Sequence, residues 1–352
     1  MTESLIEATA NRLFADHVST KLRAAAEQGE FAAAAWREVE EAGLPRALVP
    51  EEAGGFGMPP AEALAILRMA GRHAVPLPLA ETMAASWLLA GAGLDLPDGP
   101  LTLAPVTKGE ALTLVRHGAG WHLSGTATRI PWGRDAKSVA VLALHQGTPM
   151  VARLGPDGFA VTPGTNIARE PRDTLTIDAL LPADAVAPAA SGVDATAVRA
   201  LGAAMRSLQM AGAMAALLDM TTQYALDRTQ FGKPIGKFQA IQQDIAILAG
   251  EVAAARAAAD AAVERPDDLL RVATAKLRAG DAATRAAEIA HQVHGAIGYT
   301  EEHRLHRFTL RLWAWRDEHG SEELWAARLG RCVAAAGADG LWHLLTDTTE
   351  EQ

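Results

Sequence analysis

The stretch YALDRTQFGKPIGKFQAIQQ, residues 224–243, decides the fold because it places a sharp connection between two long helical segments. Gly and Pro crowd together at residues 231–236, and both residue types interrupt a helix. Apolar spacing with a helical period resumes at Phe238. Arg228 therefore falls in the last turn of the first helix. A basic side chain there either complements the helix dipole or projects towards an anionic ligand such as a pyrophosphate.

This stretch resembles the signature of the acyl-CoA dehydrogenase family, flavoenzymes in which R-x-x-F-G-K-x-I is followed by F-Q. The matching residues are Arg228, Phe231, Gly232, Lys233, Ile235, Phe238 and Gln239. In that family the Arg and the Phe reach across a subunit interface to the FAD of a neighbouring subunit, and the Arg meets the pyrophosphate. The resemblance implies that Arg228, Gln230 and Phe231 bind FAD.

A second motif, QVHGAIGYTE at residues 292–301, follows at the distance that the family pattern requires. Taken alone, it is a helix end capped by a Gly-containing turn. In the family, Q-x-x-G-G-x-G-[YF] lets the backbone approach the ADP part of FAD, because Gly has no Cβ to clash. The resemblance implies that Gln292 and Gly295 bind FAD. Ala296 replaces the second Gly of the pair, a small departure.

Composition limits the class of protein. The chain has 352 residues, of which 49% are hydrophobic and 21% charged, as in globular proteins. The net charge of −10 argues against nucleic acid as the main partner. The apolar runs predict no membrane span, and the acidic N-terminus predicts no secretory signal. The single Cys332 fits a reducing, cytoplasmic location. His291 and His294 share a helix face, but without a carboxylate or Cys at ligand spacing we expect no metal site.

The element pattern divides the chain into three parts. Residues 1–100 read as an α-helical domain, interrupted by a Gly/Pro-rich loop at residues 50–60. Short apolar runs separated by turns every 8 to 12 residues or so predict an antiparallel β domain at residues 101–190. Residues 196–352 return to helix, in segments drawn at 196–227, 236–264, 267–294 and 319–345. The resemblance implies the family fold: N-terminal helical domain, middle antiparallel β-barrel and C-terminal four-helix bundle.

The elements that hold the reactive flavin ring in the family look different in this sequence. The family motif T-E-P-x-A-G-S-D is not found in the corresponding LTLAPVTKGEALTLVR, residues 101–116. In the family run G-x-K-x-[WY]-I-[TS]-N, an aromatic residue and a hydroxyl contact the ring. Here Arg129 stands at the aromatic position and Pro131 at the hydroxyl position. Two independent ring contacts are therefore altered.

The catalytic base is altered as well. The family reaction removes the α-proton of an acyl-CoA with a carboxylate, commonly the Glu of Y-E-G-T, while the β-hydrogen leaves as hydride to FAD. An ungapped alignment from Gln292 places His319 at the Glu position and Glu318 at the Tyr position. The other family position for the base lies on the first C-terminal helix, where residues 200–212 hold no carboxylate. Three interpretations stay open: His319 acts as a base of near-neutral pKa, a one-residue shift brings in Glu318, or the chain is not catalytic alone.

The leading hypothesis is an acyl-CoA dehydrogenase-type subunit that contributes the ADP-binding half of an FAD site within a hetero-oligomer, with a homologous subunit supplying the base. Some bacterial acyl-CoA dehydrogenases, including ones acting on steroid side chains, are such α₂β₂ tetramers. One alternative is a self-sufficient homotetramer that uses Glu318 or His319. Another is a non-enzymatic scaffold that has lost flavin. The resemblance implies an acyl-CoA substrate, an electron-transfer acceptor and a place in lipid or steroid catabolism.

Overall fold

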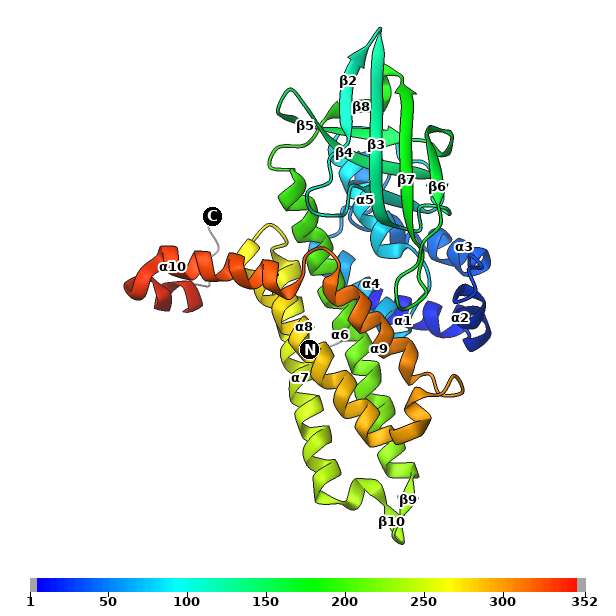
Figure 1. Ribbon diagram of the computed structural model, residues 1–352, viewed down its shortest axis with the longest axis vertical. Helices are drawn as coiled ribbons and strands as arrows, with labels where there is room; N and C mark the ends of the chain where they lie inside the picture. Colours follow the sequence, from blue (N-terminus) through cyan, green and yellow to red (C-terminus); the bar gives the residue numbers. More distant parts are fainter. Residues whose placement is uncertain (1–4, 347–352) are drawn as a thin grey trace.

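The computed structural model describes residues 5–346, and its elements follow the chain as helices, then a sheet, then helices again (Figure 1). The first group has its bounds at α1 (Leu5–His17), α2 (Thr20–Ala26), α3 (Ala33–Glu41), α4 (Pro60–Arg72) and α5 (Leu79–Gly91). α5 is apolar on nearly all sides and is buried along most of its length, as expected of a helix inside a core.

The middle of the chain forms one eight-stranded sheet. Its strands are β1 (Leu101–Ala104), β2 (Thr113–His117), β3 (Gly120–Pro131), β4 (Ser138–His145), β5 (Thr148–Leu154), β6 (Phe159–Thr162), β7 (Arg172–Leu181) and β8 (Val186–Pro188). The order across the sheet is β6-β7-β3-β2-β4-β5-β8, with β1 also paired to β4. Alternating buried and exposed residues along β7 show that one face packs on a core while the other is open.

The prediction of an antiparallel β-barrel is wrong in two respects. β1 and β2 both pair with β4 in parallel, so the sheet is mixed. The row of strands begins at β6 and ends at β8, so the sheet is open rather than closed. Turn spacing in the sequence reports where strands begin and end, but it carries no information about which strands pair. β1 and β2 are separated by a loop and lie along successive parts of the same edge of β4, an arrangement that the sequence pattern does not reveal.

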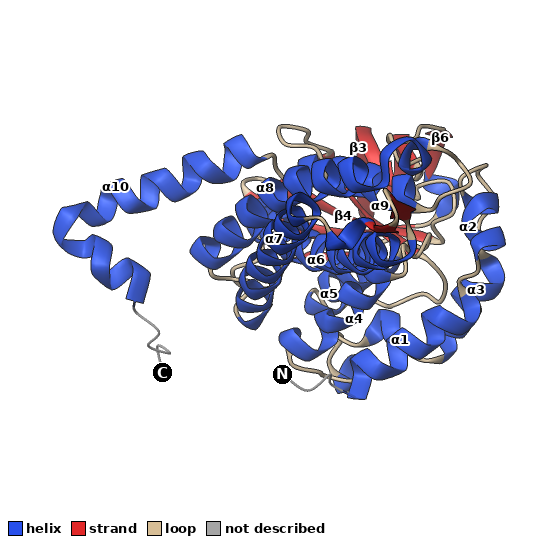
Figure 2. Cartoon of the chain, turned by 90° about the horizontal axis from the view of Figure 1, so that it is seen from below, coloured by secondary structure: helices blue, strands red, loops and turns tan. Residues whose placement is uncertain are grey.

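The C-terminal helices are α6 (Ala195–Asp227), α7 (Gln239–Glu264), α8 (Leu269–His294), α9 (Leu305–Asp317) and α10 (Glu322–Thr346). A short hairpin of β9 (Thr229–Gln230) and β10 (Lys233–Pro234) joins α6 to α7 at the lower tip of the molecule (Figure 1). α6, α7, α8 and α9 pack together as a bundle. The fourth helix of that bundle is α9, which the predicted segments omitted. The segment predicted at 319–345 corresponds to α10, which projects away from the body (Figures 1 and 2).

α6 is the helix on which the other elements assemble. Its side chains belong to two of the three apolar cores, one shared with the N-terminal helices and one inside the bundle. By length and composition α6 could cross a membrane, but 89% of its most apolar 18-residue window is buried inside the protein. The third core lies within the sheet. Because α6 joins the two helical regions, residues on its faces can connect sites that are distant in sequence.

α4 and α6 cross at very short range, which requires Gly on both helices. A Cβ added at Gly212 would lie 1.9 Å from the backbone oxygen of Arg68, and one at Gly71 would lie 2.0 Å from that of Gln209. Backbone atoms cannot yield as a flexible side chain can, so any larger residue forces the two helices apart.

We therefore expect Gly212→Ala to lower the free energy of unfolding by about 1–3 kcal/mol, the usual cost of overpacking a core. Gly250→Ala on α7 is the matched control, because a Cβ there meets no atom within 4 Å. Ala is also the better helix former, so the control should be neutral or stabilising by up to about 1 kcal/mol. Urea denaturation of both variants measures the difference. Equal stabilities would contradict the close crossing.

Candidate functional site

The residues predicted to bind FAD lie at one end of the bundle, where α6 and α8 both end. Arg228 ends α6 and is exposed, with no ion-pair partner among residues 5–346. Gln230 lies on β9. Phe231, at the tip of the hairpin, is 90% exposed and has a positive φ of 50°. A large apolar side chain this exposed is available for a contact outside the chain.

The second group of predicted FAD-binding residues lies at the end of α8. Gln292 is exposed in its last turn, and Gly295 follows the helix with φ 65°. The two helix ends are adjacent, since the ring of Tyr224 on α6 stacks on that of His294 on α8 with centroids 4.5 Å apart. The structure thus brings the predicted residues to one corner. Their role in binding FAD stays a prediction.

Glu318, one of the two predicted base candidates, lies just beyond α9 and is held between two arginines. Arg172 Nε donates to Oε1 at 2.7 Å, and Arg206 Nε donates to Oε2 at 2.8 Å. Burial by itself would raise the pKa of Glu318, but the two guanidinium groups outweigh it and lower the pKa to about 2. A carboxylate so strongly stabilised in its charged form is a weak proton acceptor.

The arginines around Glu318 belong to a larger buried network of alternating charge. Arg206 also pairs with Glu81 at 2.5 Å, so α6 is connected to α5. Arg172 also pairs with Glu170 at 3.1 Å. Glu170 in turn accepts from Arg311 Nε at 3.1 Å and Trp315 Nε1 at 3.0 Å, both on α9. The network therefore ties the β domain to three helices.

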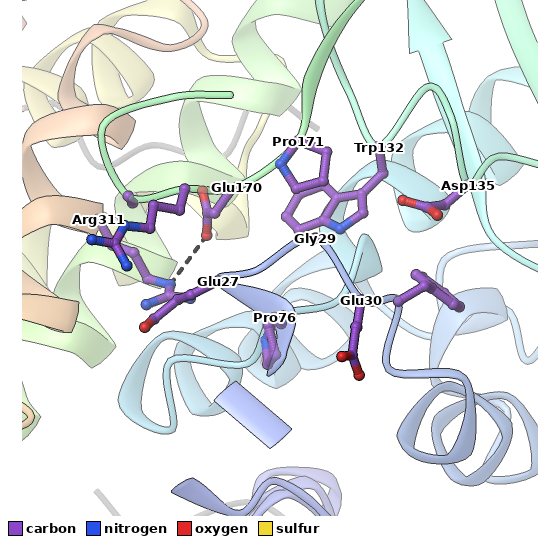
Figure 3. Close-up of a pocket in the computed structure, with 13 residues that line it drawn as sticks. Glu27, Gly29, Glu30, Pro76, Trp132, Asp135, Glu170, Pro171 and Arg311 are labelled. Carbon is purple, nitrogen blue, oxygen red and sulfur yellow. Dashed lines mark hydrogen bonds and ion pairs between the residues drawn. The ribbon is translucent and has the colours of Figure 1, made fainter. Parts of the chain in front are cut away.

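Figure 3 shows one edge of this network, around the Glu170–Arg311 ion pair. Trp132 borders a cavity of about 20 Å³ there, close to the volume of a single water molecule. Trp132 is itself buried and lies beneath the guanidinium of Arg172, 5.2 Å from its ring centroid. The segment that ends at Trp132, which in the family resemblance contacts the flavin ring, is thus packed against buried ion pairs.

His319, the other base candidate, has φ 56° and places its ring directly on α6. A Cβ added at Gly202 would lie 2.2 Å from His319 Nδ1, so only Gly at that position leaves room for the imidazole. Burial first, and then the nearby Arg206 charge, lower the pKa of His319 to about 3. At neutral pH the ring is uncharged, and it is a weaker base than an ordinary histidine. Both catalytic assignments stay predictions.

An apolar cavity of about 460 Å³ opens beside His319, between the sheet and the start of α6. Its volume is in the range of small-molecule sites. Its walls include Leu112 and Leu142, and its polar groups include Arg199, which has no ion-pair partner among the described residues. A second cavity reaches the same histidine near Arg206 but measures only about 10 Å³. Within residues 5–346 no three His, Cys, Asp or Glu side chains gather to hold a metal ion.

Sequence reasoning missed the network residues, chiefly Arg172, Arg206 and Glu170. A usable signal was present at Arg206, a charged residue inside the otherwise apolar run ALGAAMRSLQMAG. A buried charge in such a helix requires a partner of opposite sign. The sequence does not name that partner, because Glu318 lies 112 residues away.

Comparison with known proteins agrees with this architecture. The family model for the acyl-CoA dehydrogenase N-terminal domain matches residues 2–95, and that for the C-terminal domain matches residues 195–334. Acyl-CoA dehydrogenase IpdE2 of Mycobacterium tuberculosis is 31% identical, over 82% of this chain and 81% of its own length. The chain belongs to the acyl-CoA dehydrogenase family. Membership implies FAD-dependent oxidoreductase activity.

Two solved structures share the fold over nearly the whole chain. The ChsE4–ChsE5 complex from Mycobacterium tuberculosis contains a chain with TM-score 0.85 and 25% identity, covering 96% of this chain and 100% of that one. The Tcur3481–Tcur3483 steroid ACAD variant gives TM-score 0.83 and 27% identity, with 94% and 97% covered. This acyl-CoA dehydrogenase fold places the sheet and the bundle on either side of the Glu318 network.

The pKa of Glu318 makes a prediction about acid stability. The folded value of about 2 lies below the ordinary 4.5, so the charge adds stability that is complete above pH 4.5 and is lost as pH falls towards 2. Glu318→Gln should cost about 3–5 kcal/mol at pH 7, because it leaves two buried arginines short of a partner. The free energy of unfolding of this variant should also depend less on pH between pH 4.5 and pH 2.

Denaturant unfolding at pH 7, 5 and 3.5 measures both effects. Asp317→Asn is the matched control, since this neighbouring side chain is 58% exposed and has only a 3.8 Å contact with Arg316. An exposed pair of this kind contributes about 0–1 kcal/mol. If the two variants lose the same stability, Glu318 does not hold the network together.

Proposed function

We propose that this chain is a subunit of a hetero-oligomeric acyl-CoA dehydrogenase and contributes the ADP-binding half of an FAD site to a partner subunit. The observation that carries the proposal is the position of Glu318, whose two carboxylate oxygens are both taken by arginines. A general base needs a pKa matched to its task, and the two arginines hold the pKa of Glu318 well below its usual range. In this proposal the base comes from the homologous partner subunit.

The exposed residues Arg228 and Phe231 support the proposed role in FAD binding. When bound, FAD supplies the hydride acceptor of the reaction. Arg228 offers a planar guanidinium that has no ion-pair partner among residues 5–346 and that suits a pyrophosphate, and Phe231 offers an apolar face. Residues that serve a flavin held by a neighbouring subunit should point outward in the single chain, as these do. The residues present fit the group.

The relatives suggest the substrate class and the assembly. One solved relative is a complex of two named proteins, ChsE4 and ChsE5, and another is a steroid ACAD. On this basis we propose a lipid- or steroid-derived acyl-CoA as substrate, a separate electron acceptor and a cytoplasmic α₂β₂ tetramer. The non-enzymatic scaffold without flavin is the outcome if the assembled protein is colourless.

A second candidate function has an observation in its favour. The 460 Å³ cavity reaches His319, which the ungapped sequence alignment predicts at the family's base position, so a homotetramer could take substrate there. The low pKa of His319, about 3, counts against this alternative. Expression of the chain alone and with its homologous partner separates the two, by recording flavin absorbance and acyl-CoA oxidation with a dye acceptor. Turnover by the chain alone would contradict the hetero-oligomer.

Arg228→Ala tests the FAD role directly. Loss of the guanidinium removes a charge-assisted pair with the pyrophosphate, so we expect the purified complex to lose most of its flavin absorbance. Arg12→Ala, an exposed Arg on α1, is the matched control and should leave the flavin content unchanged. Full flavin content in both variants would show that Arg228 does not contact the cofactor.

A further inference from the structure

Two aromatic rings bridge the helices that carry the predicted FAD-binding residues. Tyr224 lies one turn before the end of α6, and His294 is the last residue of α8. Their ring centroids are 4.5 Å apart and their planes differ by 24°, a stacked geometry. Arg228 is four residues after Tyr224, and Gly295 directly follows His294. The stack therefore lies between the two halves of the predicted nucleotide site.

Hydrogen bonds to the backbone hold the residues on both sides of the stack in place. The Arg228 N–H donates to the Tyr224 carbonyl oxygen at 2.9 Å, so the hairpin starts from the Tyr224 turn. His294 is only 3% exposed, and its Nδ1 lies 2.7 Å from the Ala290 carbonyl oxygen one turn earlier on α8. That distance makes Nδ1 the donor and fixes the direction of the ring.

The second ring nitrogen of His294, Nε2, takes no part in the contact between α6 and α8. Nε2 is buried and has no hydrogen-bond partner among the described residues. The ring instead meets its neighbours as a flat surface: Tyr224 stacks on it, and the ring of His303 lies tilted with its centroid 4.8 Å away. The connection between α6 and α8 at this corner is therefore made by ring faces rather than by a hydrogen bond from Nε2.

We propose that the Tyr224–His294 stack is a positioning pair, which sets Arg228 at a fixed separation from Gly295 so that both meet one dinucleotide. Neither ring touches the cofactor in this proposal, which rests on the function proposed above. A guanidinium and a backbone turn that serve the same ligand must hold their geometry closely, since small misplacements are costly. The stack supplies that rigidity where α6 ends and the exposed hairpin begins.

The first test detects the Tyr224–His294 stack directly by NMR and requires no flavin. The chain has only two tyrosines, Tyr224 and Tyr299, so ¹³C-labelled tyrosine in this chain, assembled with an unlabelled partner, gives two sets of ring signals. Tyr299 stacks on His291 instead, with centroids 4.3 Å apart. We expect His294→Ala to shift the Tyr224 signals and to leave the Tyr299 signals unchanged. His291→Ala should shift the Tyr299 signals and leave the Tyr224 signals unchanged. His294→Phe should retain a ring-current shift at Tyr224, because it keeps an aromatic ring. Unmoved Tyr224 signals in His294→Ala would overturn the stack.

The second test measures the affinity for FAD. In the assembled complex, His294→Ala should weaken FAD binding about five- to tenfold, as loss of one aromatic pair implies. His294→Phe should restore most of the affinity. The KM for acyl-CoA, measured at saturating FAD, should stay at the wild-type value. His306→Ala is the control, since the His306 ring contacts the His303 carbonyl and makes no stack with Tyr224.

The outcomes separate this inference from the function on which it rests. If Arg228→Ala leaves FAD binding intact, the proposed function fails. If Arg228→Ala loses FAD while His294→Ala retains it, only the positioning role is overturned. Equal weakening by His294→Ala and His294→Phe would also overturn it, because a flat ring would then not suffice. If His294→Ala does not fold, the same comparison can be made at Tyr224, the half-buried partner. Tyr224→Leu removes the ring and should weaken FAD binding, whereas Tyr224→Phe keeps the ring and should retain it.

Discussion

The structure depends on a carboxylate that is held between two guanidinium groups, Glu318 between Arg172 and Arg206. Burying an isolated charge is costly, and burying three acidic and three basic groups in alternation offsets much of that cost. Each member needs its neighbours to remain charged. The network joins the sheet to α5, α6 and α9, so ion pairs as well as apolar packing connect these regions.

The two ends of the molecule differ in how their side chains are partnered. At the network, side chains pair with one another, and the small cavity between His319 and Arg206 measures only about 10 Å³. At the far end of the bundle, Arg228 and Phe231 are exposed, and Arg228 has no ion-pair partner among residues 5–346. The six charged groups of the network pair with one another, while the far end presents an exposed guanidinium and an exposed aromatic ring. The proposed role, in which this chain assists a neighbour's cofactor, requires exposed groups of this kind.

The sequence predicted the family, the helical regions and the exposed corner, because each rests on local signals: motif spacing, helix breaks and composition. It could not predict the pairing of strands, since the parallel contact of β1 with β4 leaves no mark in turn spacing. It also could not predict that Glu318 meets Arg172, 146 residues away. The charge of a residue is visible in a sequence, whereas the partner that sets its pKa is a property of the fold.

If His319 occupies the family's base position, as the sequence alignment predicts, the network limits what a single substitution there could restore. Placing Glu at position 319 would add a fourth carboxylate beside Glu318 and disturb the close fit on Gly202. Removing Arg206 to free Glu318 would leave Glu81 buried without its ion-pair partner. Either change leaves an uncompensated buried charge, the costliest kind of defect in a core. Because Glu81, Arg206 and Glu318 form connected ion pairs, the predicted departure from the family's catalytic pattern involves the whole network and not position 319 alone.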